Sequence, residues 1–141
     1  MAVLNPQRGP IVIATANPHK VEELRAIFAG SGIPVVGLGD LPGRDRFIEP
    51  AETGRSFEEN ATIKAESYAA QIGLPCLADD SGLEVDALGG APGVISSHYS
   101  TDGRETGVGR AARDDANNRR LLRELEGVPW EERAARFVCV M

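Results

Sequence analysis

The chain has 141 residues, of which 42% are hydrophobic and 26% charged, a balance typical of one globular domain and not of a disordered or fibrous protein. Its net charge of −6 argues against a nucleic-acid polymer as partner, because such binding depends on many basic phosphate contacts. No apolar run reaches the ~18 residues of a membrane helix, and residues 1–10 lack a signal-peptide layout, so we expect a cytoplasmic protein without a membrane partner.

Hydrophobic periodicity predicts strands and helices that alternate along a single domain over residues 1–141. A loop is expected at residues 41–55, which are rich in Gly, Pro and charge. We expect strands over residues 11–16, 33–38, 76–78, 83–88 and 136–141. We expect helices over residues 20–29, 57–72 and 114–125.

Three further predictions for the second half of the chain each rest on a few residues. Asp114 or Asp115 is expected to cap the third helix, whose inward face would carry Leu121, Leu122 and Leu125. The last strand is apolar on both faces, which predicts a buried central strand. The run Asp-Asp-Ser-Gly at 79–82 has the composition of a turn.

The first candidate site is the turn Thr-Ala-Asn-Pro-His-Lys at residues 15–20, between the first strand and helix. A helix N-terminus offers backbone N–H groups and the positive end of the helix dipole, and Lys20 adds a full charge. This arrangement favours phosphate binding, although it is not a Walker loop. An ordinary turn with a solvated lysine is the alternative.

The second candidate site is the pair Asp79 and Asp80, directly after a short strand. A turn at Ser81 and the glycine after it would let both carboxylates reach one site, where they could hold Mg²⁺ or act as a general base. The alternatives are an Asx turn, or a Ca²⁺ loop completed by Glu84 and Asp86.

The third candidate is Glu52, in the loop ahead of the helix that carries Asn60 and Lys64. Lys64 follows Phe57 by seven residues, so it should point beside the apolar stripe of that helix, and Asn60 faces the same way. A lysine at that edge either extends to water or faces a cleft. The alternative for Glu52 is a solvated charge.

Several ordered blocks, spread over nearly the whole chain, resemble the inosine/xanthosine triphosphate pyrophosphatases. Residues 15–24 are similar to the family's Thr-Gly-Asn-x-x-Lys-x-x-Glu opening, with Ala16 in place of Gly. Later blocks of the family are matched by residues 52–65, 77–94, 115–118 and 136–139. Such a series of blocks in the same order is more specific than any single motif.

The resemblance implies an α/β fold with a mixed, twisted sheet flanked by helices, a nucleotide cleft between two lobes, and a homodimer. It implies Mg²⁺-dependent hydrolysis of ITP, dITP and XTP to the monophosphate and pyrophosphate. The implied Mg²⁺ ligands are Glu52, Asp79 and Asp80, and Asp80 is also the catalytic base. The implied substrate-binding residues are Thr15, Ala16, Asn17, Pro18, His19, Lys20, Lys64 and Ser81.

The family's C-terminal blocks have no counterpart in these 141 residues. They contain an aromatic that stacks on the base, a Gly-Phe-Gly-Tyr-Asp-Pro segment and a Ser-His-Arg motif. We therefore expect a domain that is incomplete at its C-terminus, turns over poorly and scarcely prefers inosine to adenosine triphosphate. Two alternatives stay open: a non-catalytic nucleotide- or metal-binding fragment, and a pyrophosphatase for modified pyrimidine nucleotides.

Overall fold

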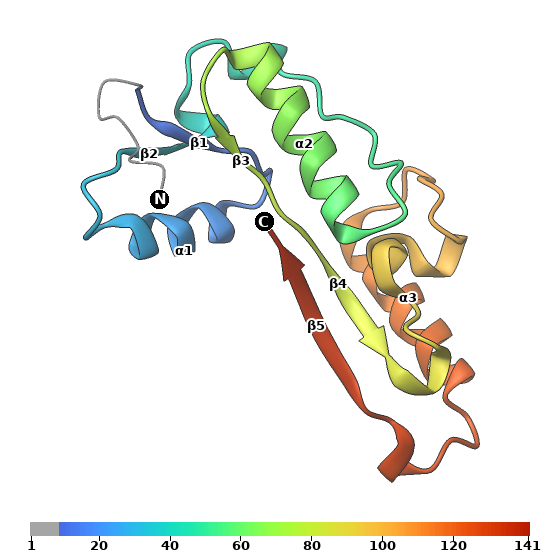
Figure 1. The fold of residues 1–141 in the computed structure, drawn as a ribbon. Coiled ribbons are helices and arrows are strands. Elements are labelled where there is room, and N and C mark those ends of the chain that lie inside the picture. The colour runs from blue at the N-terminus through green and yellow to red at the C-terminus, as the bar shows by residue number, and fades with distance from the viewer. Residues whose placement is uncertain (1–8) are drawn as a thin grey trace. The chain divides into compact units, whose positions relative to one another are not determined.

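In the computed structural model, which describes residues 9–141, the chain forms two units that each contain a small sheet (Figure 1). Residues 1–8, part of the stretch expected to lack a signal peptide, lie outside the described residues. The first unit takes in residues up to 54, then 58–79 and 141, and the second takes in 55–57 and 80–140. No helix within residues 9–141 is long and apolar enough to cross a membrane.

Three short parallel strands form the sheet of the first unit. β1 (Ile11–Ile13) lies between β2 (Val35–Gly37) and β3 (Cys76–Leu77). Val12 of β1 pairs with Val36 on one side and with Cys76 on the other. Val12 is fully buried, as expected for a parallel strand that is covered on both faces.

α1 (Pro18–Phe28) connects β1 to β2 and packs against this sheet through Val21 and Leu24. It begins where Asn17 caps the helix, and Pro18 occupies the first turn, which needs no N–H from that residue. Two 3₁₀ helices follow β2, η1 (Leu38–Asp40) and η2 (Arg44–Arg46). The predicted strand–helix–strand opening is confirmed, with shorter strands than expected.

α2 (Phe57–Ile72) is the long helix predicted from its apolar stripe. Tyr68, in the part of the helix that belongs to the first unit, is buried in a cluster with Ala14 and Ala78, and Ala65 and Ile72 pack against the same cluster. The stripe predicted for residues 57–72 is therefore confirmed by its burial.

The second unit is built on an antiparallel pair, β4 (Asp80–Val85) and β5 (Ala135–Val140), in which Leu83 lies opposite Phe137. A 3₁₀ segment, η4 (Gly93–Thr101), packs beside β4. The remaining elements are α3 (Arg110–Glu124), which packs on η4, and two short 3₁₀ helices, η3 (Asp86–Leu88) and η5 (Trp130–Glu132). One parallel and one antiparallel sheet, with helices, confirm the mixed α/β class.

The turn expected at Ser81 and Gly82 is wrong, because both residues lie inside β4. Ser81 pairs with Cys139 and Gly82 with Val138 in the ladder to β5. Here the hydrogen bonds to a partner strand far along the chain override the local turn composition.

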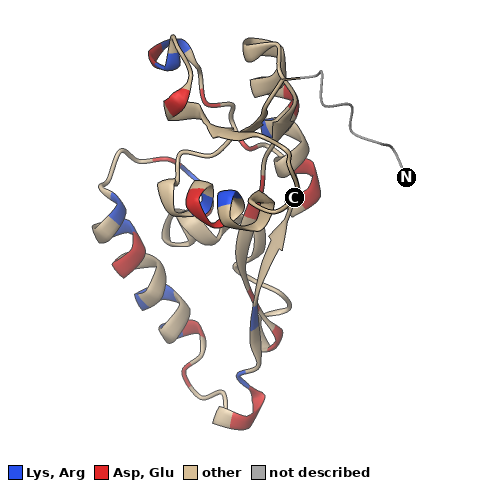
Figure 2. Cartoon of the chain, turned by 90° about the vertical axis from the view of Figure 1, so that its left-hand side faces the viewer, with Lys and Arg blue, Asp and Glu red and all other residues tan. Residues whose placement is uncertain are grey.

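The third helix begins at Arg110 and not at Asp114 or Asp115, which instead form i,i+4 ion pairs with arginines. Figure 2 shows such opposite charges interspersed along α3. These pairs and the good helix propensity of Ala and Arg favour an earlier start. Of the predicted inward residues, Leu125 is buried but Leu122 is 62% exposed, which corrects the expected face.

The last strand is not buried. In β5 the side chain of Phe137 is 86% exposed, so the predicted central strand is wrong. β5 pairs with β4 alone among residues 9–141, so one of its backbone edges is unpaired there, and little of the described chain covers the side chain of Phe137. An apolar composition on both faces therefore did not distinguish a central strand from an edge strand.

A buried tyrosine joins η4 to α3 in the second unit. Arg120 stacks over the Tyr99 ring, 4.3 Å from its centroid, and donates hydrogen bonds to Asp102 at 2.7 Å and Glu124 at 2.9 Å. The Tyr99 hydroxyl donates to Glu124. Burial, with the nearby Glu124, raises the pKa of Tyr99 to about 12.

This raised pKa predicts a loss of stability at alkaline pH. Because the unfolded chain releases the Tyr99 proton near its ordinary pKa of 10, the stabilisation is complete below pH 10 and is lost as pH rises toward 12. The melting temperature, followed by circular dichroism, should therefore fall more steeply above pH 10 in the parent chain than in Tyr99→Phe. Tyr68 titrates in both chains and cancels in this comparison. Parallel pH profiles would contradict the prediction.

Candidate functional site

The turn between β1 and α1 is fixed by its own side chains. The backbone N–H of Asn17 donates to the Thr15 hydroxyl at 3.1 Å, and the backbone N–H of His19 donates to the Asn17 side-chain oxygen at 3.0 Å. Asn17 is thus the helix cap, and His19 lies exposed on the turn. The positive end of the α1 dipole lies at this turn.

A hollow of about 380 Å³ lies beside the same turn, within the first unit. Three of the predicted substrate-binding residues line it, namely Thr15, Ala16 and Pro18. Its other walls come from α1 and from the segment around η1, with Val21, Glu22, Arg25 and residues 37–40. The structure therefore places half of the predicted phosphate turn on a concave surface.

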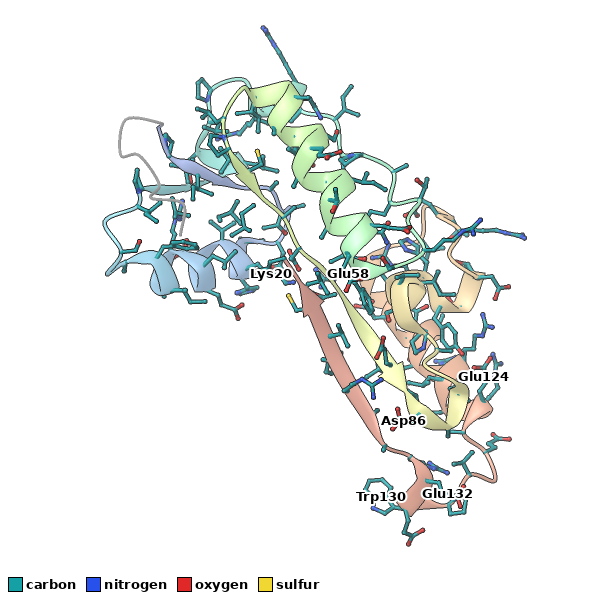
Figure 3. The ribbon with its side chains drawn as sticks, viewed as in Figure 1. Lys20, Glu58, Asp86, Glu124, Trp130 and Glu132 are labelled. Carbon is teal, nitrogen blue, oxygen red and sulfur yellow. The ribbon has the colours of Figure 1, made fainter. Side chains whose placement is uncertain are left out.

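Lys20 and Asp79 form an ion pair, although 59 residues separate them in sequence. Lys20 extends from the start of α1 (Figure 3), and Asp79 is the last residue of the first-unit segment that carries β3. The carboxylate is 9% exposed and the lysine side chain 25%. A nearly buried carboxylate needs such a partner, because burial of an unpaired charge is costly.

Asp80 begins β4 and is as buried as Asp79, at 7% exposure for each residue. One of its carboxylate oxygens accepts the backbone N–H of Ser81 at 3.0 Å. Ser81 is exposed and lies on the opposite face of β4 from Asp80. Two consecutive buried acids are unusual, since Asp is among the residues least often buried.

Lys64 and Glu52 form the second lysine–carboxylate pair, with 2.9 Å between Nζ and Oε1. The Lys64 side chain is only 15% exposed, so the predicted position beside the apolar stripe of α2 is confirmed. Glu52 is held by a partner, which removes the alternative of a purely solvated charge.

The three predicted Mg²⁺ ligands do not form a ready-made cluster. Among residues 9–141, no three His, Cys, Asp or Glu side chains gather into a group that could hold a metal ion. Instead Asp79 is paired with Lys20, and Glu52 with Lys64. The chemistry of the donors still fits Mg²⁺, a hard cation that binds carboxylate oxygens. The ligand set of Glu52, Asp79 and Asp80 stays a prediction.

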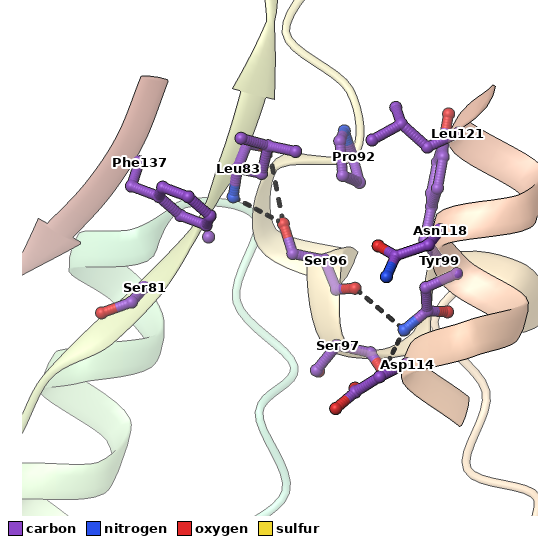
Figure 4. Close-up of a pocket in the computed structure, with 12 residues that line it drawn as sticks. Ser81, Leu83, Pro92, Ser96, Ser97, Tyr99, Asp114, Asn118, Leu121 and Phe137 are labelled. Carbon is purple, nitrogen blue, oxygen red and sulfur yellow. Dashed lines mark hydrogen bonds between the residues drawn. The ribbon is translucent and has the colours of Figure 1, made fainter. Parts of the chain in front are cut away.

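A second hollow, of about 440 Å³, lies wholly within the second unit (Figure 4). Its apolar wall includes Leu83, Leu121 and Phe137, and Ser81 is the one predicted substrate-binding residue on its rim. This hollow was not predicted from the sequence, because the patterns around Leu121 and Phe137 indicated residues buried in a core.

Two polar residues of α2 contact the preceding loop, Asn60, which was singled out beside Lys64, and Gln71, which was missed. Asn60 and Gln71 each hydrogen-bond to the backbone of the loop that carries Glu52. Together with Lys64 and Ser67 they follow the spacing i, i+4, i+7 and i+11, which places them on one side of the helix. That spacing is visible in the sequence and could have indicated a shared role.

The chain is similar to enzymes with a known activity. A dITP/XTP pyrophosphatase from Frankia alni is 52% identical over 129 residues, which are 92% of this chain and 60% of the relative. One from Geobacillus kaustophilus is 48% identical over 131 residues, which are 93% of this chain and 59% of the relative. The chain thus spans about 60% of the length of these relatives.

Solved structures agree with these sequence matches. A nucleoside-triphosphatase / dITP/XTP pyrophosphatase from Mycobacterium abscessus superposes with a TM-score of 0.71 at 42% identity, over 93% of this chain and 63% of that one. A HAM1 protein from Coxiella burnetii gives a TM-score of 0.74 at 36% identity, over 93% of this chain and 60% of that one. The sequence profile of the Ham1 family matches residues 11–141, and the chain therefore belongs to the Ham1 family.

Proposed function

We propose that this chain takes part in the hydrolysis of deaminated purine nucleoside triphosphates, such as dITP and XTP, to the monophosphate and pyrophosphate. The pairing of Lys20, at the N-terminus of α1, with the nearly buried Asp79 is the observation that supports the proposal most. It joins a phosphate-binding cation to an acid that can bind a metal ion. The names of the relatives, dITP/XTP pyrophosphatases, support the same substrate class.

The first unit supplies the groups for phosphate. Lys20 and the dipole of α1 would attract a phosphate oxygen to the hollow lined by Thr15 and Ala16. Lys64, paired with Glu52 at 2.9 Å, offers a second cation on α2. The Thr15 hydroxyl already accepts the N–H of Asn17 and still carries a proton that it can donate to an oxygen of the substrate.

Asp80 is the proposed general base. It would take a proton from the water that attacks the triphosphate, and the bond to the leaving pyrophosphate would break. Its burial and the N–H of Ser81 fix the carboxylate in one orientation. Mg²⁺, if held by Glu52, Asp79 and Asp80, would neutralise charge on the triphosphate as it reacts. The homodimer that the resemblance implies stays a prediction.

Release of pyrophosphate from dITP, XTP and dATP, each measured with and without Mg²⁺, tests the proposal. We expect release from dITP and XTP that requires Mg²⁺. Nucleotide binding without any release would instead support the non-catalytic nucleotide-binding alternative. If the chain neither binds these nucleotides nor releases pyrophosphate from them, both the proposal and this alternative are contradicted.

Lys64→Met should weaken binding of a nucleoside triphosphate at least about tenfold, because a hydrogen bond to a charged group is lost. Met has a similar length and good helix propensity, so α2 should stay folded. Titration calorimetry gives the affinity, and circular dichroism gives the melting temperature. Arg110→Met, at a 78% exposed side chain of α3, removes one positive charge elsewhere and serves as the control. Normal affinity together with a lowered melting temperature would show that Lys64 is structural.

A further inference from the structure

One side of α2 carries a line of polar residues that contacts the loop of residues 48–54. Asn60, Lys64, Ser67 and Gln71 recur at three- and four-residue intervals, so they lie one above another along the helix. Asn60 contacts the loop at Gly54, and Lys64 contacts it at Glu52. Gln71 contacts it at Ile48. The helix thus holds the loop through side chains.

Gln71 holds the beginning of the loop. Its Oε1 accepts the backbone N–H of Ile48 at 2.8 Å, and its Nε2 donates to the carbonyl of Ile48 at 2.9 Å. Nε2 also lies 3.3 Å from the Ser67 hydroxyl. The adjacent Phe47 packs against the buried cluster that contains Tyr68, whereas Ile48 is 75% exposed, so Ile48 itself is held mainly by these hydrogen bonds. The side-chain amide of Gln71 therefore makes the same pair of hydrogen bonds to the Ile48 backbone as a residue of a neighbouring strand would make.

Asn60 holds the end of the loop. Its side-chain oxygen accepts the backbone N–H of Gly54 at 2.7 Å, and the residue is only 2% exposed. A Cβ on Gly54 would lie 2.6 Å from that oxygen and 2.7 Å from Cβ of Glu59. Only glycine permits such a close approach of loop and helix at this point.

Glu52 lies between these two attachments, and its partner Lys64 lies between Asn60 and Gln71 on the helix. The neighbouring loop residues Ala51 and Thr53 are exposed. The two attachments and the ion pair therefore contribute to fixing where the Glu52 carboxylate lies.

We propose that Asn60 and Gln71 are positioning residues, which hold the loop along α2 so that the Glu52 carboxylate meets Lys64 and the metal ion. The part that concerns the metal rests on the proposed function. Neither residue needs to touch the nucleotide or the ion. Each acts through the backbone on either side of Glu52.

Gln71→Met and Asn60→Leu remove the hydrogen bonds at nearly constant side-chain size. Hydrogen exchange measured by NMR should become at least about tenfold faster at the amide of Ile48 in the first variant and of Gly54 in the second. The Mg²⁺ concentration for half-maximal pyrophosphate release should rise several-fold in both, while the rate at saturating Mg²⁺ stays within about twofold. In a Glu52→Gln background, neither variant should shift the half-maximal Mg²⁺ concentration further.

Two controls separate positioning from stability. Asn60→Asp keeps the acceptor oxygen, so the Gly54 amide should stay protected. Ala61→Gly destabilises the buried side of the same helix and removes no side-chain hydrogen bond to the loop, so it should leave the half-maximal Mg²⁺ concentration unchanged. If Ala61→Gly shifts that concentration as much as Asn60→Leu, general destabilisation explains the effect and the proposal fails.

The outcomes distinguish this proposal from the proposed function. Unchanged exchange at Ile48 and Gly54 overturns the positioning role. Faster exchange in an active enzyme whose Mg²⁺ requirement does not move overturns the link to the metal. Faster exchange in a chain that releases no pyrophosphate at all overturns the proposed function and supports the attachment of the loop.

Discussion

Asp80→Asn is expected to lower the rate of pyrophosphate release at least about 100-fold, because proton transfer by a positioned side chain contributes roughly 10²–10⁴ to a rate. The amide keeps the size of the carboxylate. Its oxygen can still accept the backbone N–H of Ser81, which lies 3.0 Å from the Asp80 carboxylate in the parent chain. It cannot take a proton from water. Affinity for the nucleotide should therefore stay within about tenfold of the parent chain.

Asp86→Asn is the matched control, since it makes the same chemical change six residues along the chain. Asp86 is exposed and pairs with Arg136 at 3.0 Å, at the far end of the β4–β5 pair from Asp80. Its rate should equal that of the parent. A near-normal rate in Asp80→Asn would assign the base to another residue, and a large fall in melting temperature would reveal a structural loss instead.

Gly82→Ala is expected to destabilise the second unit by about 3 kcal/mol, near the upper end of the usual cost of overpacking. A Cβ at Gly82 would lie 2.5 Å from the carbonyl oxygen of Gly93, 2.7 Å from the Ser96 hydroxyl and 2.8 Å from the Phe57 ring. Two of these neighbours are fixed, because the Ser96 hydroxyl bonds to the N–H of Leu83 and to the carbonyl of Gly93. The clash therefore cannot be relieved by a side-chain rotation alone.

Urea unfolding of Gly82→Ala, followed by circular dichroism, measures this cost. The control is Gly30→Ala, where a Cβ would meet no atom within 4 Å. It should change the free energy of unfolding by less than about 0.5 kcal/mol. Equal stability of the two variants would contradict the packing that the structure shows around β4.

Local patterns predicted the first unit well, because each of its elements carries its own signal. The spacing of Val21 and Leu24 indicated α1, and the stripe through Tyr68 indicated α2. Both signals depend on residues within a few turns of one another. Pro18 likewise fixed the start of α1 through its own backbone geometry.

The errors at β4 and β5 share a cause, which is that the outcome depends on residues far apart in sequence. Ser81 and Gly82 read locally as a turn, and only their pairing with Cys139 and Val138 makes them a strand. Phe137 has the local pattern of a buried residue, but distant parts of the described chain leave its side chain 86% exposed. Single-sequence periodicity contains no information about such partners.

The candidate site was predicted residue by residue but not as a set of contacts. The phosphate turn at residues 15–20 followed from its position at a helix start, and three of its residues line a hollow. The pairing of Lys20 with Asp79 spans 59 residues and could not be deduced from spacing. Gln71 was overlooked because a polar residue on an exposed helix face is usually only solvated.

The attachments of the loop to α2 leave that loop little slack. Asn60 and Gln71 are eleven residues apart, about 16 Å along a helix that rises 1.5 Å per residue. The six steps from Ile48 to Gly54 can span at most about 20–22 Å when fully extended. The segment is therefore at roughly three-quarters of its full extension. Deleting two residues from it would prevent both ends from being held at once, whereas an inserted residue would have to bulge outward and carry Glu52 away from Lys64.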